Sequence, residues 1–124
     1  MLERRKDFRF RAREQTFAAL HNGCIRVGRL QNISRGGLAF QYMLINHPRS
    51  TGFSVDIFAA GTEFHLSNVP CRTVYDIDLP GQGANGNFFP TLMSRQCGLQ
   101  FKELTETETD RLRFFLKTYT HGHD

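Results

Sequence analysis

Basic side chains gather at the start of the chain, where they could bind an anion. Six of the sixteen Lys and Arg residues fall in the first thirteen positions, with phenylalanines among them. Arg5 and Arg9 are four apart, and a guanidinium is a planar, charged fork of donors that suits phosphate oxygens and the acceptor edge of guanine. On a helix the two would share one face, and in a bent, extended segment they could clamp a ligand from two sides. Alone, this spacing is more typical of a solvated tail.

A second short segment offers polar groups at a predicted turn, Asn32-Ile33-Ser34-Arg35-Gly36-Gly37. Asn and Ser side chains bond to nearby backbone, and glycine tolerates positive φ and lets a ligand approach bare backbone. Polar turns with glycine are usually structural, so this segment is also weak evidence on its own. Together, the basic segment and the turn predict a site for a compact anionic ligand that carries guanine.

Short strands must position these groups. Asn22-Gly23 is a hairpin signal between two strand-like runs, 16–20 and 24–30. Further strands are predicted at 38–42, 53–58, 64–66, 71–75 and 95–101. Loops are expected at 45–52 and at the glycine-rich segment 80–87.

A helix is predicted near the carboxyl end, at about 105–119. Thr105 and Glu108 fit a capping box at its start. Leu112, Phe115 and Tyr119 form an apolar stripe at helical spacing, which favours packing against the sheet over docking of a partner.

These elements predict a mainly β protein: a six-stranded antiparallel β-barrel with a C-terminal α-helix. Closure of a barrel removes the free edges that short strands would otherwise expose. The 124 residues suit one domain, so we expect a flexible basic arm at 1–13 and a single domain at 14–124.

Composition limits the class of protein further. The formal net charge of +4 favours anionic partners, but much of it lies in the arm. Cys24, Cys71 and Cys97 are odd in number and far apart, which favours reduced, partly buried thiols over a disulfide or a metal site. With neither a secretory signal nor a membrane-crossing run, we expect a cytoplasmic protein that does not insert into membranes.

Catalytic and metal-binding patterns are weak. Ser34 lacks the glycine two positions earlier that a nucleophile elbow needs, so no catalytic residue is predicted. The His121-Gly122-His123 run is expected to be a frayed tail, and no metal ligand is assigned. Asp76 and Asp78 are expected to lie in a solvated turn beside the glycine-rich loop.

The order of the motifs is more specific than either motif. Arg5 and Arg9 form an R-x-x-x-R arm, and Asn32, Ser34 and Gly37 form an N-x-S-x-x-G turn after the second predicted strand. This arrangement resembles the PilZ domain family of bacterial cyclic di-GMP receptors, whose pattern is R-x-x-x-R followed by [D/N]-x-S-x-x-G. The segment 97–101 also looks like the closing strand of that family.

The resemblance covers roughly residues 3–119 and implies a ligand but no cofactor. It implies a cyclic di-GMP site at Arg4, Arg5, Arg9, Asn32, Ser34, Gly36 and Gly37. Arg5 and Arg9 would meet guanine O6 and N7 and the phosphates, while Asn32 and Ser34 would read the other guanine. The two glycines would give room and backbone donors. Arg4 could stack on a second ligand molecule, which leaves one or two ligands per protomer open.

The main prediction is therefore a non-enzymatic cyclic di-GMP receptor that signals to an unidentified downstream protein, with homodimer formation left open. An alternative is a small basic barrel that binds RNA or single-stranded nucleic acid, since Phe8-Arg9-Phe10-Arg11 interleaves aromatic and basic side chains. The modest charge and the lack of a basic stripe on later strands disfavour nucleic acid. A third reading is a scaffold of the same fold that binds no nucleotide and only holds a partner.

Overall fold

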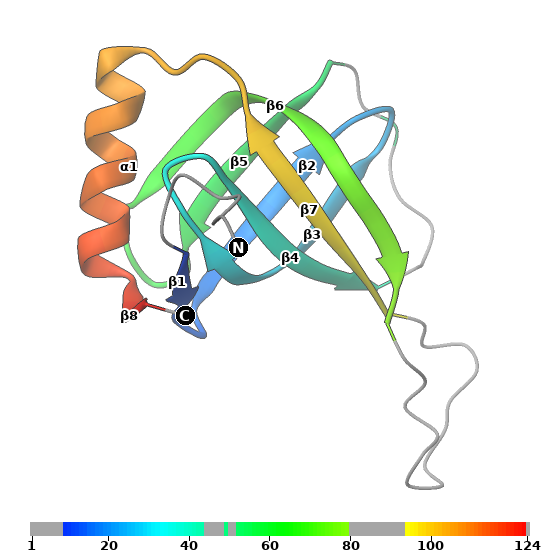
Figure 1. The fold of residues 1–124 in the computed structure, drawn as a ribbon, viewed down its shortest axis with the longest axis horizontal. Coiled ribbons are helices and arrows are strands. Elements are labelled where there is room, and N and C mark those ends of the chain that lie inside the picture. Colours follow the sequence, from blue (N-terminus) through cyan, green and yellow to red (C-terminus); the bar gives the residue numbers. More distant parts are fainter. Residues whose placement is uncertain (1–8, 44–48, 50–51, 80–93, 124) are drawn as a thin grey trace, which may run out of the picture.

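The computed structural model describes residues 9–43, 49, 52–79 and 94–123 of the chain. Figure 1 shows a strongly curved sheet with one helix beside it. In this described part the elements are β1 (Phe10–Ala12), β2 (Thr16–His21), β3 (Ile25–Ile33), β4 (Gly37–Met43), β5 (Ser54–Ala59), β6 (His65–Asp78), β7 (Ser94–Phe101), α1 (Glu106–Thr118) and β8 (Thr120–His123). No helix in these ranges is long and apolar enough to cross a membrane.

Six of the strands close into a ring. The strand order is β2-β5-β6-β7-β4-β3-β1-β8, and an additional pairing of β2 with β3 joins the ends of the six-stranded part. Every pairing is antiparallel, as short consecutive strands allow. The predicted six-stranded antiparallel barrel is confirmed, and β1 and β8 extend it beyond β3.

Alternating side chains fill the barrel. In β5, Val55, Ile57 and Ala59 are buried while the residues between them are partly exposed. Among the described residues, Phe40 on β4 and Phe115 on α1 are the largest side chains with no exposed surface. Burying a side chain of this size is worth roughly 1.5–3 kcal/mol, so these rings hold much of the core together.

Helix α1 packs along the barrel through its apolar stripe. Leu112 and Phe115 are buried, and Tyr119 packs against Phe115 with ring centroids 5.3 Å apart. The helix begins at the predicted capping box: the Thr105 hydroxyl accepts from the Glu108 amide at 3.1 Å, and the Glu108 carboxylate accepts from the Thr105 amide at 2.9 Å. The helix covers 106–118, against the expected 105–119, and the stripe packs against the core.

Strand β6 corrects the prediction of two short strands at 64–66 and 71–75. It runs unbroken for 14 residues, and its register against β5 shifts by one residue between Val55 and Ile57. Asn68 takes up the shift at a φ of 58°, and its amide donates to the Asp56 carboxylate at 2.9 Å. This register shift is a β-bulge. It accommodates the turn-forming residues, so the strand bends there but continues.

The same strand carries Asp76 and Asp78, for which a solvated turn was expected. That expectation is wrong, because both carboxylates pair with Arg95 on the neighbouring strand β7. Asp76 also accepts from the Tyr42 hydroxyl at 2.8 Å. Cross-strand pairing therefore continues β6 to Asp78, where the sequence pattern no longer alternates clearly.

Both ends of the described chain are strands. Phe10–Ala12 pairs with β3 and with β8, although 1–13 as a whole was expected to be a flexible arm. The expected frayed tail at 121–123 lies within β8. Pairing satisfies the backbone groups of both segments and Ala12 is buried, so these residues are part of the barrel. The predicted loop at 80–87 lies outside the described residues.

Candidate ligand-binding site

The basic segment and the polar turn meet at one corner of the barrel. Arg9 precedes β1, and the pairing of β1 with β3 sets Arg11 opposite Asn32. This register brings the Arg9 guanidinium to the Asn32 side chain, where Nη1 donates to Oδ1 at 2.9 Å. Two predicted site residues, 23 positions apart in the chain, are therefore in direct contact. Arg4 and Arg5 lie outside the described residues.

Ser34 stabilises the turn between β3 and β4. Its side chain is almost fully buried, and its hydroxyl accepts from the Gly36 amide at 3.1 Å. Its own amide donates to the Gly37 carbonyl at 2.8 Å. The carbonyl of Gly36 in turn accepts from the Phe101 amide at 2.8 Å, which ties the turn to β7. In this arrangement the Ser34 hydroxyl serves the local backbone.

Gly37 allows close contact between β4 and β7. A Cβ added to Gly37 would lie 2.1 Å from the Leu99 carbonyl oxygen, so any other residue would force β4 away from β7. Positive φ and close approach of a ligand to the backbone were the expected reasons for glycine at this turn. In the part of the chain that the structure describes, positive-φ glycines are Gly23, Gly52 and Gly61, so close approach is the reason at Gly37.

A charged cluster that the sequence did not predict crosses β4, β6 and β7. Arg95 donates through Nε to the Asp76 carboxylate at 2.9 Å and through Nη2 to the Asp76 carbonyl at 2.7 Å. Burial and the hydrogen bond to Asp76 raise the pKa of Tyr42, and the hydrogen bond to Asp76 raises the pKa of Arg95. Arg26 lies over the Tyr42 ring at 5.8 Å from its centroid. Each charged or polar side chain of this cluster has an oppositely charged or polar partner, which is typical of a network that stabilises the fold.

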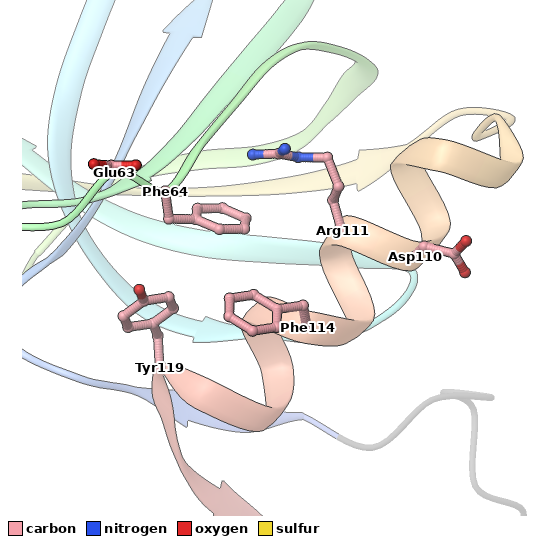
Figure 2. A pocket seen from close by; sticks show the side chains of 6 residues that line it. All are labelled: Glu63, Phe64, Asp110, Arg111, Phe114 and Tyr119. Carbon is pink, nitrogen blue, oxygen red and sulfur yellow. The ribbon is translucent and has the colours of Figure 1, made fainter.

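A cavity of about 430 Å³ lies between α1 and the segment that precedes β6. Its lining residues are Glu63, Phe64, Asp110, Arg111, Phe114 and Tyr119 (Figure 2). In the close view the three aromatic rings gather around the hollow, and the Arg111 guanidinium lies 5.0 Å from the Phe64 ring centroid. None of the predicted site residues that the structure describes lines this cavity, so it is separate from the Arg9–Asn32 corner.

No metal centre is found in the described ranges, which contain no group of three or more His, Cys, Asp and Glu side chains that could hold an ion. The cysteines are all unpaired, with Cys71 and Cys97 buried and Cys24 partly exposed. Burial raises the pKa of the Cys71 thiol to about 11 and that of Cys97 to about 12. The two buried thiols are therefore neutral at physiological pH.

Comparison with solved structures identifies two similar folds. The PilZ domain with c-di-GMP of YcgR from Escherichia coli has a TM-score of 0.66 and 14% identity, with 93% of this chain and 92% of that chain covered. The Klebsiella pneumoniae MrkH–c-di-GMP complex has a TM-score of 0.62 and 18% identity, with 94% of this chain covered. The chain spans about half of MrkH, 52% of its length.

Sequence comparison gives one result at the level of the family and none among curated proteins. No curated protein matches the chain. The family model described as PilZ domain matches residues 3–117. That range contains the basic segment, the turn, the six barrel strands and almost all of α1. The chain therefore belongs to the PilZ domain family.

Proposed function

We propose that this protein is a receptor for cyclic di-GMP and that it has no catalytic activity. The observation that carries the proposal is the hydrogen bond from Arg9 to Asn32, because it unites the two parts of the predicted site in a chain of the PilZ family. Two structures of similar fold are described as complexes with this dinucleotide, which supports the choice of ligand.

Each binding residue would contact a different part of the ligand. Arg9 has five N–H donors, and the Asn32 contact uses one, so several remain for guanine or phosphate acceptors. Asn32 would read a polar base edge, with Gly36 and Gly37 beside it, while Ser34 would keep the turn in shape. We include Arg4 and Arg5 from the motif alone.

The expected free energies of these contacts are large enough to bind a ligand of this kind. A hydrogen bond to a charged group contributes roughly 1.5–3 kcal/mol net. Micromolar affinity needs about 8 kcal/mol, so four or five such contacts are enough once the cost of ordering the basic segment is subtracted. One arginine should therefore account for a large share of the affinity.

Ligand binding would also change the amino-terminal surface. The basic segment contains five like charges within residues 4–11, and two phosphates would neutralise part of that charge. We propose that the segment then closes over the turn and that the new surface is recognised by a downstream protein in the cytoplasm. Proteolysis within residues 4–11 should slow when the ligand is added, and unchanged cleavage would argue against closure.

Selectivity tests the proposal against nucleic-acid binding. The purified chain is titrated calorimetrically with cyclic di-GMP, GTP and a short single-stranded RNA at low and high salt. We expect cyclic di-GMP to bind at least tenfold more tightly than the other two, with a moderate salt dependence. Tight RNA binding that collapses as salt rises would indicate a nucleic-acid protein instead.

A further inference from the structure

The cavity beside α1 has aromatic walls, and one of its rings faces water. Phe64, Phe114 and Tyr119 line this cavity of about 430 Å³, which we call the aromatic hollow (Figure 2). Phe64 is buried, whereas Phe114 is 52% exposed. A single exposed ring on a protein surface is ordinary, but this ring is the wall of a hollow that is large enough for a side chain of another molecule. Such a side chain would remove apolar surface from water.

The walls of the aromatic hollow are held in place by contacts within the chain. Phe64 and Phe114 stack with their ring centroids 6.1 Å apart, and Tyr119 meets Phe114 edge-on at 6.3 Å. The Arg111 guanidinium lies over the Phe64 ring, and its Nη2 donates to the His65 carbonyl at 2.8 Å. A partner would therefore meet a preformed surface, and little affinity would be lost in ordering it.

Carboxylates lie along the rim. Glu63 and Asp110 line the aromatic hollow, and a second hollow of about 470 Å³ shares Glu63 and is lined by Asp56 as well. Asp110 pairs with Arg113 at 3.3 Å, but both side chains are exposed, and such pairs contribute little. Glu63 is exposed, and no hydrogen bond or ion pair joins it to another residue in the described part of the chain.

This combination indicates the chemistry of the partner. An apolar side chain would fill the space between the rings, and a cation beside it would pair with the Glu63 carboxylate. The stem of a lysine or arginine can also pack on apolar surface while its charge stays at the rim. Arg111 does not supply this cation, because its guanidinium contacts the Phe64 ring and a backbone carbonyl.

We propose that the aromatic hollow docks a segment of a partner protein that carries a large apolar side chain, with a lysine or arginine next to it or at the next position but one. The apolar side chain packs against Phe64, Phe114 and Tyr119, and the basic side chain pairs with Glu63. The inference goes beyond the proposed function, because the aromatic hollow is separate from the Arg9–Asn32 corner. Its test needs no cyclic di-GMP.

Peptide selection identifies the preferred sequence without knowledge of the natural partner. Random linear peptides displayed on phage are selected on the purified wild-type chain and, separately, on Glu63→Lys. We expect wild type to enrich peptides with a large apolar residue and a nearby lysine or arginine, and Glu63→Lys to enrich an acidic residue in place of the basic one. Failure to enrich any sequence, or the same basic sequence from both chains, would overturn the proposal.

The best peptide from wild type is then titrated into variants by calorimetry. Phe114→Ala should weaken its binding roughly ten- to a hundredfold, as expected for an aromatic side chain at the centre of an interface. Phe53→Ala is the control, because Phe53 is 68% exposed and lines neither hollow, and its affinity should match wild type. Circular dichroism checks that both variants are folded. Wild-type affinity in folded Phe114→Ala would contradict the proposal.

The charge is tested in the same way. Glu63→Lys should weaken binding of the basic peptide at least tenfold at low salt, and by less as salt rises. Glu103→Lys makes the same charge change at an exposed position that lines neither hollow, and it should bind like wild type. Equal losses in the two variants would show that only the net charge of the chain matters, which would refute the role of Glu63.

Self-association and nucleotide binding are measured separately. A dimer of the wild-type chain in ultracentrifugation that Phe114→Ala dissociates would show that a second copy occupies the aromatic hollow, and the proposal would be wrong. The peptide experiments contain no nucleotide, so their failure would refute the docking site and leave the receptor function standing. Failure of wild type to bind cyclic di-GMP, with the peptide still bound, would refute only the receptor function.

Discussion

The Ser34 side chain was expected to contact a ligand, but in the structure it is buried within the turn. Its buried hydroxyl accepts from the Gly36 amide, so a motif residue predicted to read guanine first of all fixes the local backbone. The sequence could indicate a polar turn here, because Asn, Ser and Gly have known local preferences. It could not indicate which partner the hydroxyl takes, since that depends on the distance to a carbonyl or amide in three dimensions.

Replacement of Ser34 should loosen the turn. Ser34→Ala leaves the Gly36 amide without its acceptor, and we expect the free energy of unfolding to fall by about 1–2 kcal/mol in urea titration. Ser67→Ala is the matched control, because Ser67 is exposed on β6, and its effect should be within about 0.5 kcal/mol. Equal stability of the two variants would show that the hydroxyl contributes nothing to the turn.

The buried thiols predict how stability depends on pH. Burial raises the pKa of the folded-state Cys97 thiol from 9.0 to about 12 and that of Cys71 to about 11, whereas the unfolded thiols titrate near the ordinary value. Above that value the unfolded state binds fewer protons than the folded state, so stability falls as pH rises. For each thiol we expect a loss on the order of 1–3 kcal/mol between about pH 8 and about pH 11.

A cysteine variant isolates this effect from the other groups that titrate at alkaline pH. Cys97→Ala should be less stable at neutral pH, because it leaves a small cavity, but its stability should decline less steeply above about pH 9. Parallel decline of wild type and variant in urea titrations at each pH would contradict the assignment.

At the scale of secondary-structure elements, the features predicted from the sequence are those that depend on residues close together in the chain. Helix α1 was predicted almost to its last residue, because a capping box and an apolar stripe both depend on neighbours within one turn. The bulge at Asn68 was not predicted, because Asn and Pro read as a turn until the pairing with β5 and β7 is known. The same holds for β1 and β8, which are too short to show a pattern: β1 pairs with β3 and with β8, and β8 pairs with β1.

We predict how much the capping box contributes to the free energy of unfolding. Thr105→Ala removes the acceptor for the Glu108 amide and should cost about 1 kcal/mol of stability in urea titration. Thr107→Ala is the control on the same first turn: Thr107 is exposed, and alanine has the higher helix propensity, so stability should be unchanged or slightly greater. A loss at Thr107 as large as that at Thr105 would show that the cap has no special role.

At the scale of the whole molecule, the pairing of β1 with β3 brings the two motifs of the proposed site together. The register of β1 against β3 places Arg9 beside Asn32, so two motifs that are separate in the sequence become one surface. The order of the motifs predicted this association only through the resemblance to a family.

The most direct test is a calorimetric titration of wild type and Arg9→Ala with cyclic di-GMP. Arg9→Ala removes one partner of the contact between the basic segment and the turn, and we expect affinity to fall roughly ten- to a hundredfold from a micromolar value. Arg113→Ala is the control: it removes the same charge from an exposed position on α1, and its affinity should match wild type. Wild-type affinity in Arg9→Ala, or no binding by wild type, would contradict the account.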